Sequence, residues 1–173
     1  MKENTYKIVL CACFSTLATI TFTIENLFPP LILPGARLGL SNVYILLSII
    51  LLGGLYGFIT LTVKLLLGSL FGGNVSALMY SLPAAIVSFS VQTSLIYFIK
   101  KVSIVAVSVV GAVLNITVQN CVFCLVTRMS EYLIYLPYLA IISIIGGIAV
   151  GFIVYLILRR IPTTKNYSKE ENL

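Results

Sequence analysis

Long apolar stretches separated by short polar segments dominate the sequence. The apolar runs at residues 6–24, 75–99, 103–126 and 132–158 are each close to the roughly 20 residues that a helix needs to cross a bilayer. A fifth run, residues 38–73, would measure about 54 Å as one helix, whereas a hydrocarbon core is about 30 Å thick. We expect this run to break at Gly53-Gly54, which predicts six transmembrane helices in all.

The segment between the first two predicted helices, residues 25–37, has a different character. It carries prolines at positions 29, 30 and 34, which neither a helix nor a central strand accommodates. We therefore expect a structured, rather apolar loop at the membrane face.

The positions of the basic residues predict the orientation of this bundle. With six crossings and a cytoplasmic N-terminus, eight basic residues lie inside and only Arg37 and Arg128 lie in outer loops, as the positive-inside rule requires. The eight are Lys2, Lys7, Lys100, Lys101, Arg159, Arg160, Lys165 and Lys169. With five crossings, the Lys100-Lys101 doublet and the basic C-terminal segment would lie outside. We therefore predict an all-α integral membrane protein with both termini cytoplasmic, in which residues 1–162 form a single six-helix domain and residues 163–173 a short polar tail.

Composition supports a membrane protein and argues against catalysis. The chain is 60% hydrophobic and 9% charged, against roughly 25% charged residues in an ordinary soluble domain. It contains no Asp, His or Trp, which excludes a Ser-His-Asp triad, a histidine metal site and an aspartate-rich magnesium motif for diphosphates. Cys121 and Cys124 form a C-x-x-C inside a predicted membrane helix, where apolar filling is the better interpretation. We expect no enzyme activity, cofactor, metal or nucleic-acid partner; the bilayer is the first expected partner.

Four predicted helices carry a stripe of small or polar residues at helical spacing. These stripes are Cys11, Ser15, Thr19 and Thr23; Gly57, Thr60, Lys64 and Gly68; Ser81, Ala85, Ser88 and Gln92; and Ser108, Gly111, Asn115 and Gln119. Such a stripe is either a packing seam between helices or the lining of a polar cavity. The amides and the lysine favour a cavity, whereas the first stripe favours packing.

Lys64 is the most informative single residue, because a charge near mid-membrane usually faces a partner or a cavity. It forms either an internal ion pair with Glu25 or a site for the anionic group of a ligand. Arg37, in the outer loop, is either an interfacial anchor or a second ligand contact. A helix that begins near Leu38 would direct its free N–H groups toward the same region. We select as candidate ligand-binding residues Glu25, Asn26, Arg37, Asn42, Lys64, Asn115 and Gln119, and as candidate loop or close-packing glycines Gly35, Gly39, Gly68 and Gly111.

Two of these motifs resemble those of a known family. The run from Glu25 to Asn42 resembles the N-terminal pattern of the bacterial Gx transporter family, also called heptaprenyl diphosphate synthase component I. That pattern reads Pro-Gly-Ala-Lys-Leu-Gly-Leu-Ala-Asn; here Arg37 replaces the lysine and Ser41 the second alanine. The second match is the stripe from Ser108 to Gln119, in which Leu114 stands where the family tends to have histidine and Thr117 where glycine is common.

The resemblance implies a six-helix fold similar to the S components of energy-coupling-factor vitamin transporters. In those proteins the ligand lies in an outward-facing cavity capped by the loop after the first helix. Small residues on that helix contact the transmembrane coupling subunit, so the resemblance implies a docking face at Cys11, Ser15 and Thr19.

Three functions follow from the resemblance. The first is a binding subunit in the bacterial cytoplasmic membrane that captures a small anionic, isoprenoid-like or vitamin-like ligand from outside. The sequence has no phosphate-binding Gly-x-x-x-x-Gly-Lys-Ser/Thr loop, so energy-coupling transmembrane and ATPase subunits would power it. The second is a non-catalytic component of heptaprenyl diphosphate synthase in menaquinone synthesis, with a soluble prenyl synthase as partner. The third is a membrane subunit of flavin- or quinone-linked extracellular electron transfer, with a flavin-carrying membrane partner.

Overall fold

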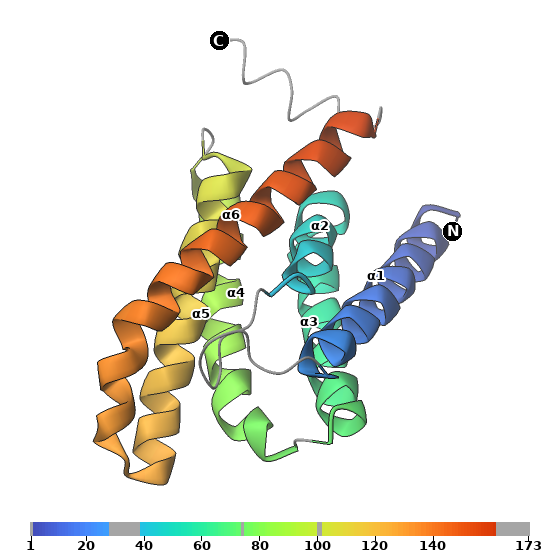
Figure 1. Ribbon diagram of the computed structural model, residues 1–173. Coiled ribbons are helices and arrows are strands. Elements are labelled where there is room, and N and C mark those ends of the chain that lie inside the picture. The colour runs from blue at the N-terminus through green and yellow to red at the C-terminus, as the bar shows by residue number, and fades with distance from the viewer. Residues whose placement is uncertain (1, 28–38, 74, 100–101, 162–173) are drawn as a thin grey trace.

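The computed structural model describes residues 2–27, 39–73, 75–99 and 102–161, and over these residues the chain is helical without strands. Within these described ranges six α-helices follow one another (Figure 1). They are α1 (Lys2–Leu27), α2 (Asn42–Leu52), α3 (Gly54–Phe71), α4 (Leu78–Phe98), α5 (Ile104–Thr127) and α6 (Leu136–Arg160). Two short 3₁₀ turns, η1 (Val75–Ala77) and η2 (Ser130–Tyr135), precede α4 and α6.

Five segments of the described chain are long and apolar enough to cross a membrane, which makes this a multi-pass membrane protein. They are Asn4–Asn26, Gly54–Phe71, Val75–Phe98, Ile104–Thr127 and Glu131–Arg160. The sixth predicted crossing stays a prediction, because α2 has 11 residues and is roughly 16 Å long, about half the thickness of a hydrocarbon core. A full second crossing would also need the chain that precedes α2.

The predicted break between the second and third helices is confirmed at Gly53. Its φ of 104° is one that L side chains rarely adopt, and its N–H donates to the carbonyls of Ser48 and Ile49 at the end of α2. The chain reverses there, and a Cβ on Gly57 would collide with Ile49, so α3 packs closely against α2.

The helices form two groups of three. In the first half α1, α2 and α3 pack on one another, and in the second half α5 packs on both α4 and α6 (Figure 1). Two glycines of α6 allow this helix to pack closely against α5. A Cβ on Gly147 would lie 2.8 Å from Cα of Val109, and one on Gly151 would lie 2.6 Å from Cα of Val105. Small residues of this kind let membrane helices approach closely.

Helix α2 fills the space between the two halves. An apolar cluster joins it to α5 and α6, formed by Val43, Leu46, Leu47, Val107, Val150, Val154 and Leu158. On its other side Ile45 and Ile49 pack against Leu61 and Leu65 of α3 and Ala85 of α4. The short helix is therefore a core element.

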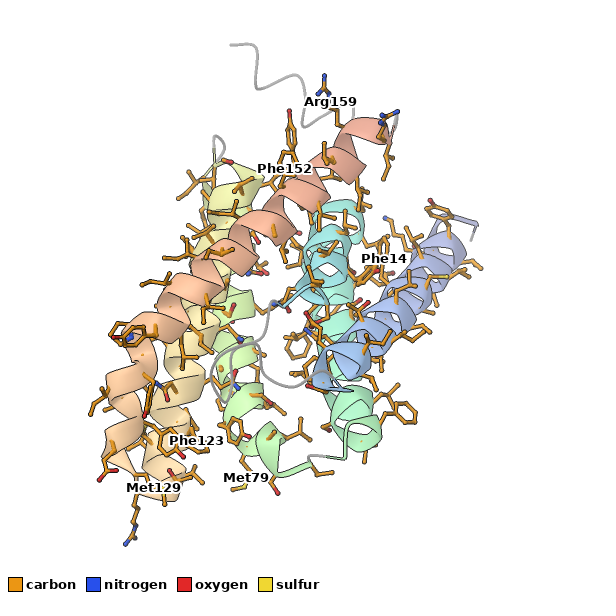
Figure 2. The ribbon with its side chains drawn as sticks, viewed as in Figure 1. Phe14, Met79, Phe123, Met129, Phe152 and Arg159 are labelled. Atoms are coloured by element: carbon orange, nitrogen blue, oxygen red, sulfur yellow. The ribbon has the colours of Figure 1, made fainter. Side chains whose placement is uncertain are left out.

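The first turn of α1 and the last turn of α6 lie at the same end of the bundle (Figure 1). Arg159 lies at this end, and Met79 and Met129 lie at the opposite end (Figure 2). We call these the basic end and the opposite end. Large apolar side chains such as Tyr6, Ile145 and Phe152 are exposed on the outside of the bundle, where a bilayer would surround them.

Candidate ligand-binding site

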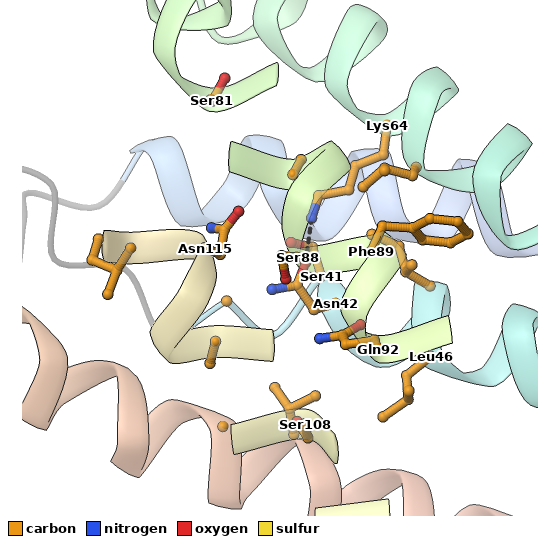
Figure 3. Close-up of a pocket in the computed structure, with 18 of the residues that line it drawn as sticks. Ser41, Asn42, Leu46, Lys64, Ser81, Ser88, Phe89, Gln92, Ser108 and Asn115 are labelled. Carbon is orange, nitrogen blue, oxygen red and sulfur yellow. Dashed lines mark hydrogen bonds between the residues drawn. The ribbon is translucent and has the colours of Figure 1, made fainter. Parts of the chain in front are cut away.

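A cavity of about 110 Å³ lies between the two halves and is lined by residues from all six helices (Figure 3). Its apolar lining includes the rings of Phe22 and Phe89. Its polar lining comprises Glu25, Ser41, Asn42, Lys64, Ser81, Ser88, Gln92, Ser108, Asn115, Gln119 and Ser143. Three of the four predicted polar stripes therefore contribute to one cavity.

Lys64 carries a buried positive charge into this cavity. The residue is 4% exposed, and its Nζ donates a 2.7 Å hydrogen bond to Oδ1 of Asn42, the first residue of α2 (Figure 3). The same Nζ lies 5.3 Å from the centre of the Phe22 ring, within range of a cation–π contact. Placing a charged side chain inside a membrane bundle costs free energy, and such residues usually face a cavity or a partner. Lys64 is therefore a candidate functional residue.

Glu25 holds the start of α2. Its Oε1 accepts a 2.7 Å hydrogen bond from the backbone N–H of Leu40, and its Oε2 accepts a 3.2 Å hydrogen bond from Oγ of Ser41. The turn is completed at Gly39, whose φ is 69° and whose carbonyl accepts from the N–H of Asn42. A carboxylate at a helix N-terminus is favoured by the helix dipole. Glu25 of α1 and Lys64 of α3 thus both form hydrogen bonds with residues at the start of α2.

The wall formed by α4 and α5 depends on Gly111. Oγ of Ser88 donates a 2.7 Å hydrogen bond to the Gly111 carbonyl. A Cβ on Gly111 would collide with the side chain of Gln92, so the glycine leaves room for that amide. Further along α5, Asn115 and Gln119 line the same cavity.

Some lining residues were missed by the sequence analysis. Gln92 and Ser88 were recognised as part of a stripe but were not selected as site residues. Ser143 and Gly147 of α6 were not identified at all, although both line the cavity. Their spacing of four residues, continued by Gly151, was the signal that could have found them.

Other predicted residues lie elsewhere. Gly68 does not line the cavity: a Cβ there would collide with the Phe22 ring, so it serves the packing of α3 against α1. Asn26 lies beside Gly72, where a Cβ would come within 3.0 Å of Asn26 Nδ2, and its Oδ1 is buried without a hydrogen-bond partner in the described part of the chain. Gly35 and Arg37 fall outside the described residues.

The docking face implied for Cys11, Ser15 and Thr19 needs correction. All three side chains are at most 6% exposed and face the interior of the first half. Sγ of Cys11 and Oγ of Ser15 lie 3.6 and 3.5 Å from Oγ1 of Thr60, which in turn is 3.2 Å from Oγ of Ser48. Small residues let α1 approach α3 here, so this stripe is a packing seam within the chain.

Most polar side chains in the cavity wall are carboxamides and hydroxyls. Carboxamides and hydroxyls do not titrate near neutral pH and act as hydrogen-bond donors and acceptors. Over residues 2–27, 39–73, 75–99 and 102–161, no group of three or more His, Cys, Asp or Glu side chains could hold a metal ion. Cys121 is exposed and Cys124 buried, and both are free thiols.

Comparison with known proteins gives one match. The sequence model of the family described as "Heptaprenyl diphosphate synthase component I" matches residues 14–157, a range that contains every residue lining the cavity. No curated protein and no solved structure matches the chain.

Proposed function

The chain belongs to the heptaprenyl diphosphate synthase component I family, and from this premise we propose that it is a membrane-embedded binding subunit that captures a small ligand with an anionic group. The observation that carries the proposal is Lys64, a lysine only 4% exposed in the wall of a polar cavity between two helix groups. A cation in this position attracts an anionic group of a ligand.

The packing between the two halves suggests the end from which a ligand enters the cavity. The apolar cluster that includes Val107, Val154 and Leu158 packs the halves together toward the basic end. We therefore propose that the ligand reaches the cavity from the opposite end. Because basic residues favour the cytoplasmic side, we propose that the ligand enters from the outer face of a bacterial cytoplasmic membrane.

Transport across the membrane would need a separate source of energy. The chain carries no nucleotide-binding loop of the Gly-x-x-x-x-Gly-Lys-Ser/Thr type. We propose that energy-coupling transmembrane and ATPase subunits supply it, as in transporters with an S component. Because the α1 stripe is buried, those partners would contact other surfaces of the bundle.

A binding experiment tests this proposal directly. The full chain in mild detergent is heated with a panel of vitamins and isoprenoid diphosphates, and its melting temperature is recorded. We expect at least one compound to raise the melting temperature, and Lys64→Met to remove that shift without changing the amount of protein in the membrane. Leu67→Met, at an exposed position of the same helix, is the matched control. A shift that survives in Lys64→Met, or no shift with any compound, contradicts the proposal.

The family description supports a second candidate function. A non-catalytic membrane component of heptaprenyl diphosphate synthase would assist a soluble catalytic subunit, because a chain without aspartate cannot supply an aspartate-rich magnesium site. Co-purification with a soluble prenyl synthase and loss of long-chain product in a deletion strain are the expected results. A deletion strain with products of normal length contradicts it.

A further inference from the structure

Four aromatic rings form a continuous row at the opposite end of the bundle, where Phe123 lies (Figure 2). The ring centroids of Tyr80 and Phe123 are 5.3 Å apart and those of Phe123 and Tyr132 are 5.1 Å apart, both in edge-to-face geometry. Tyr135 continues the row, with its ring centroid 6.3 Å from that of Tyr132. Nδ2 of Asn120 also donates a 3.3 Å hydrogen bond to the Tyr132 carbonyl. This ring row therefore joins η2 to α5 and α4.

The outer side of η2 and of the first turn of α6 is apolar and exposed. Leu133, Ile134 and Tyr135 are 43%, 71% and 45% exposed, and Tyr138 of α6 is 61% exposed. Large exposed apolar patches mark surfaces that contact a membrane or another protein. Two of these four side chains are tyrosines, which combine an apolar ring with a polar hydroxyl and suit a boundary between lipid and water.

Two charged residues limit how deep this segment can lie in a bilayer. Arg128, which ends α5, and Glu131 of η2 are both exposed, and charged side chains avoid the hydrocarbon core. The length of α6 gives the same limit. This helix has 25 residues and is about 38 Å long, whereas the core is about 30 Å thick, so α6 can cross without η2 even at a usual tilt. The apolar side chains of η2 therefore belong at the boundary of the core.

We propose that η2 and the first turn of α6 form an interfacial anchor that binds the headgroup region of the lipid bilayer at the opposite end. The exposed tyrosines lie at headgroup level, as they do in aromatic belts. Leu133 and Ile134 enter the start of the acyl chains, and Arg128 and Glu131 stay in contact with water. The ring row connects the anchor to α4 and α5, so the anchor sets the depth of these helices. This role is independent of the proposed binding function.

A depth measurement tests the anchor, because the sequence contains no tryptophan. In the full chain, Ile134→Trp places one tryptophan at an exposed position of η2, and Ile148→Trp places one at an exposed position in the middle of α6. Each variant is reconstituted into phosphatidylcholine bilayers with bromine either near the headgroup end of the acyl chains or deep within them. We expect the shallow bromine to quench the fluorescence of Ile134→Trp more strongly, and the deep bromine that of Ile148→Trp.

Tyr135→Trp exchanges one aromatic ring for another in the same segment and serves as a second variant if Ile134→Trp does not fold. Quenching of the η2 variants by iodide in the water phase, with no quenching by either brominated lipid, overturns the anchor. A docking surface for a partner protein would give this result in bilayers made of lipid alone. Deep bromine that quenches the η2 variants as strongly as Ile148→Trp also overturns it, because η2 would then lie within the core.

The ring row has its own test in the Ile134→Trp background. Phe123→Leu removes the central ring, so we expect η2 to move more freely and the tryptophan to lose fluorescence anisotropy in the bilayer. Phe152→Leu is the matched control, at an exposed position of α6 away from the ring row (Figure 2). Equal anisotropy in the Phe123→Leu and Phe152→Leu proteins overturns the connection between the anchor and α5.

Discussion

Lys64 and Asn42 join the middle of α3 to the first turn of α2 through a hydrogen bond of 2.7 Å from Nζ to Oδ1. The bond lies in the cavity wall, and the lysine is 4% exposed. Because one partner is charged, a bond of this kind contributes about 1.5–3 kcal/mol, more than a bond between neutral groups. The pair therefore links the lysine that we propose binds the ligand to the position of the short central helix.

A double-mutant cycle tests this link. Lys64→Met and Asn42→Leu each remove one partner, and we expect their combined effect on the free energy of unfolding to be smaller than the sum by roughly 1–3 kcal/mol. Chemical unfolding in mixed micelles measures all four proteins. The cycle of Asn42→Leu with Leu67→Met, at an exposed site on α3, should be additive within about 0.5 kcal/mol. Additivity in both cycles contradicts the link.

Glu25 is expected to stabilise the start of α2. Glu25→Leu removes both acceptors, those for Leu40 N–H and Ser41 Oγ, and should lower the free energy of unfolding by about 1.5–3 kcal/mol. Glu25→Gln keeps one oxygen acceptor but loses the charge, so its effect should be smaller. Glu131→Gln, at an exposed position in η2, is the control and should stay within about 0.5 kcal/mol of the unaltered chain. Equal stability of Glu25→Leu and the unaltered chain argues against this role.

The break at Gly53 could be predicted from the sequence, whereas the length of α2 could not. The apolar run 38–73 does not show where within it a helix begins, and the first turn of α2 is set by tertiary contacts of Glu25 with Leu40 and Ser41. Hydropathy alone therefore could not show that the helix within this run has 11 residues and packs between the two halves. The break at Gly53 was predictable because the need for glycine at positive φ is a local property, whereas a sixth crossing stays a prediction.

The polar stripes show a second limit of sequence reasoning. Ser15 on α1 and Asn115 on α5 belong to stripes with the same helical spacing, yet Ser15 is packed against Thr60 and Asn115 lines the cavity. Periodicity identifies the face that turns away from lipid. Whether that face packs against another helix or lines a cavity depends on the arrangement of all the helices. No single stripe contains this information.

The orientation of the bundle can be tested by labelling. In a variant whose four cysteines are replaced by alanine, we expect a cysteine at Ser76 to react with a membrane-impermeant maleimide added to intact cells. A cysteine at Arg159 should react only after the membrane is opened. Ser76 lies in η1, three residues before Met79 at the opposite end, whereas Arg159 lies at the basic end (Figure 2), and basic residues favour the cytoplasmic side. Labelling of the Arg159 site in intact cells would reverse the predicted orientation and, with it, the side from which the ligand enters.

The close contact of α5 and α6 gives a prediction that is independent of any ligand. A methyl group at Gly151 would lie 2.6 Å from Cα of Val105, and because that neighbour is backbone it cannot move away as a side chain would. Gly151→Ala should therefore separate the helices and lower the free energy of unfolding by about 1–3 kcal/mol, the usual cost of overpacking. Ala149→Val adds bulk to the exposed face of α6 and should change stability little. If Gly151→Ala unfolds at the same denaturant concentration as the Ala149→Val control, the two helices do not pack as closely as the structure shows, and the wall that α5 and α6 give to the cavity loses its support.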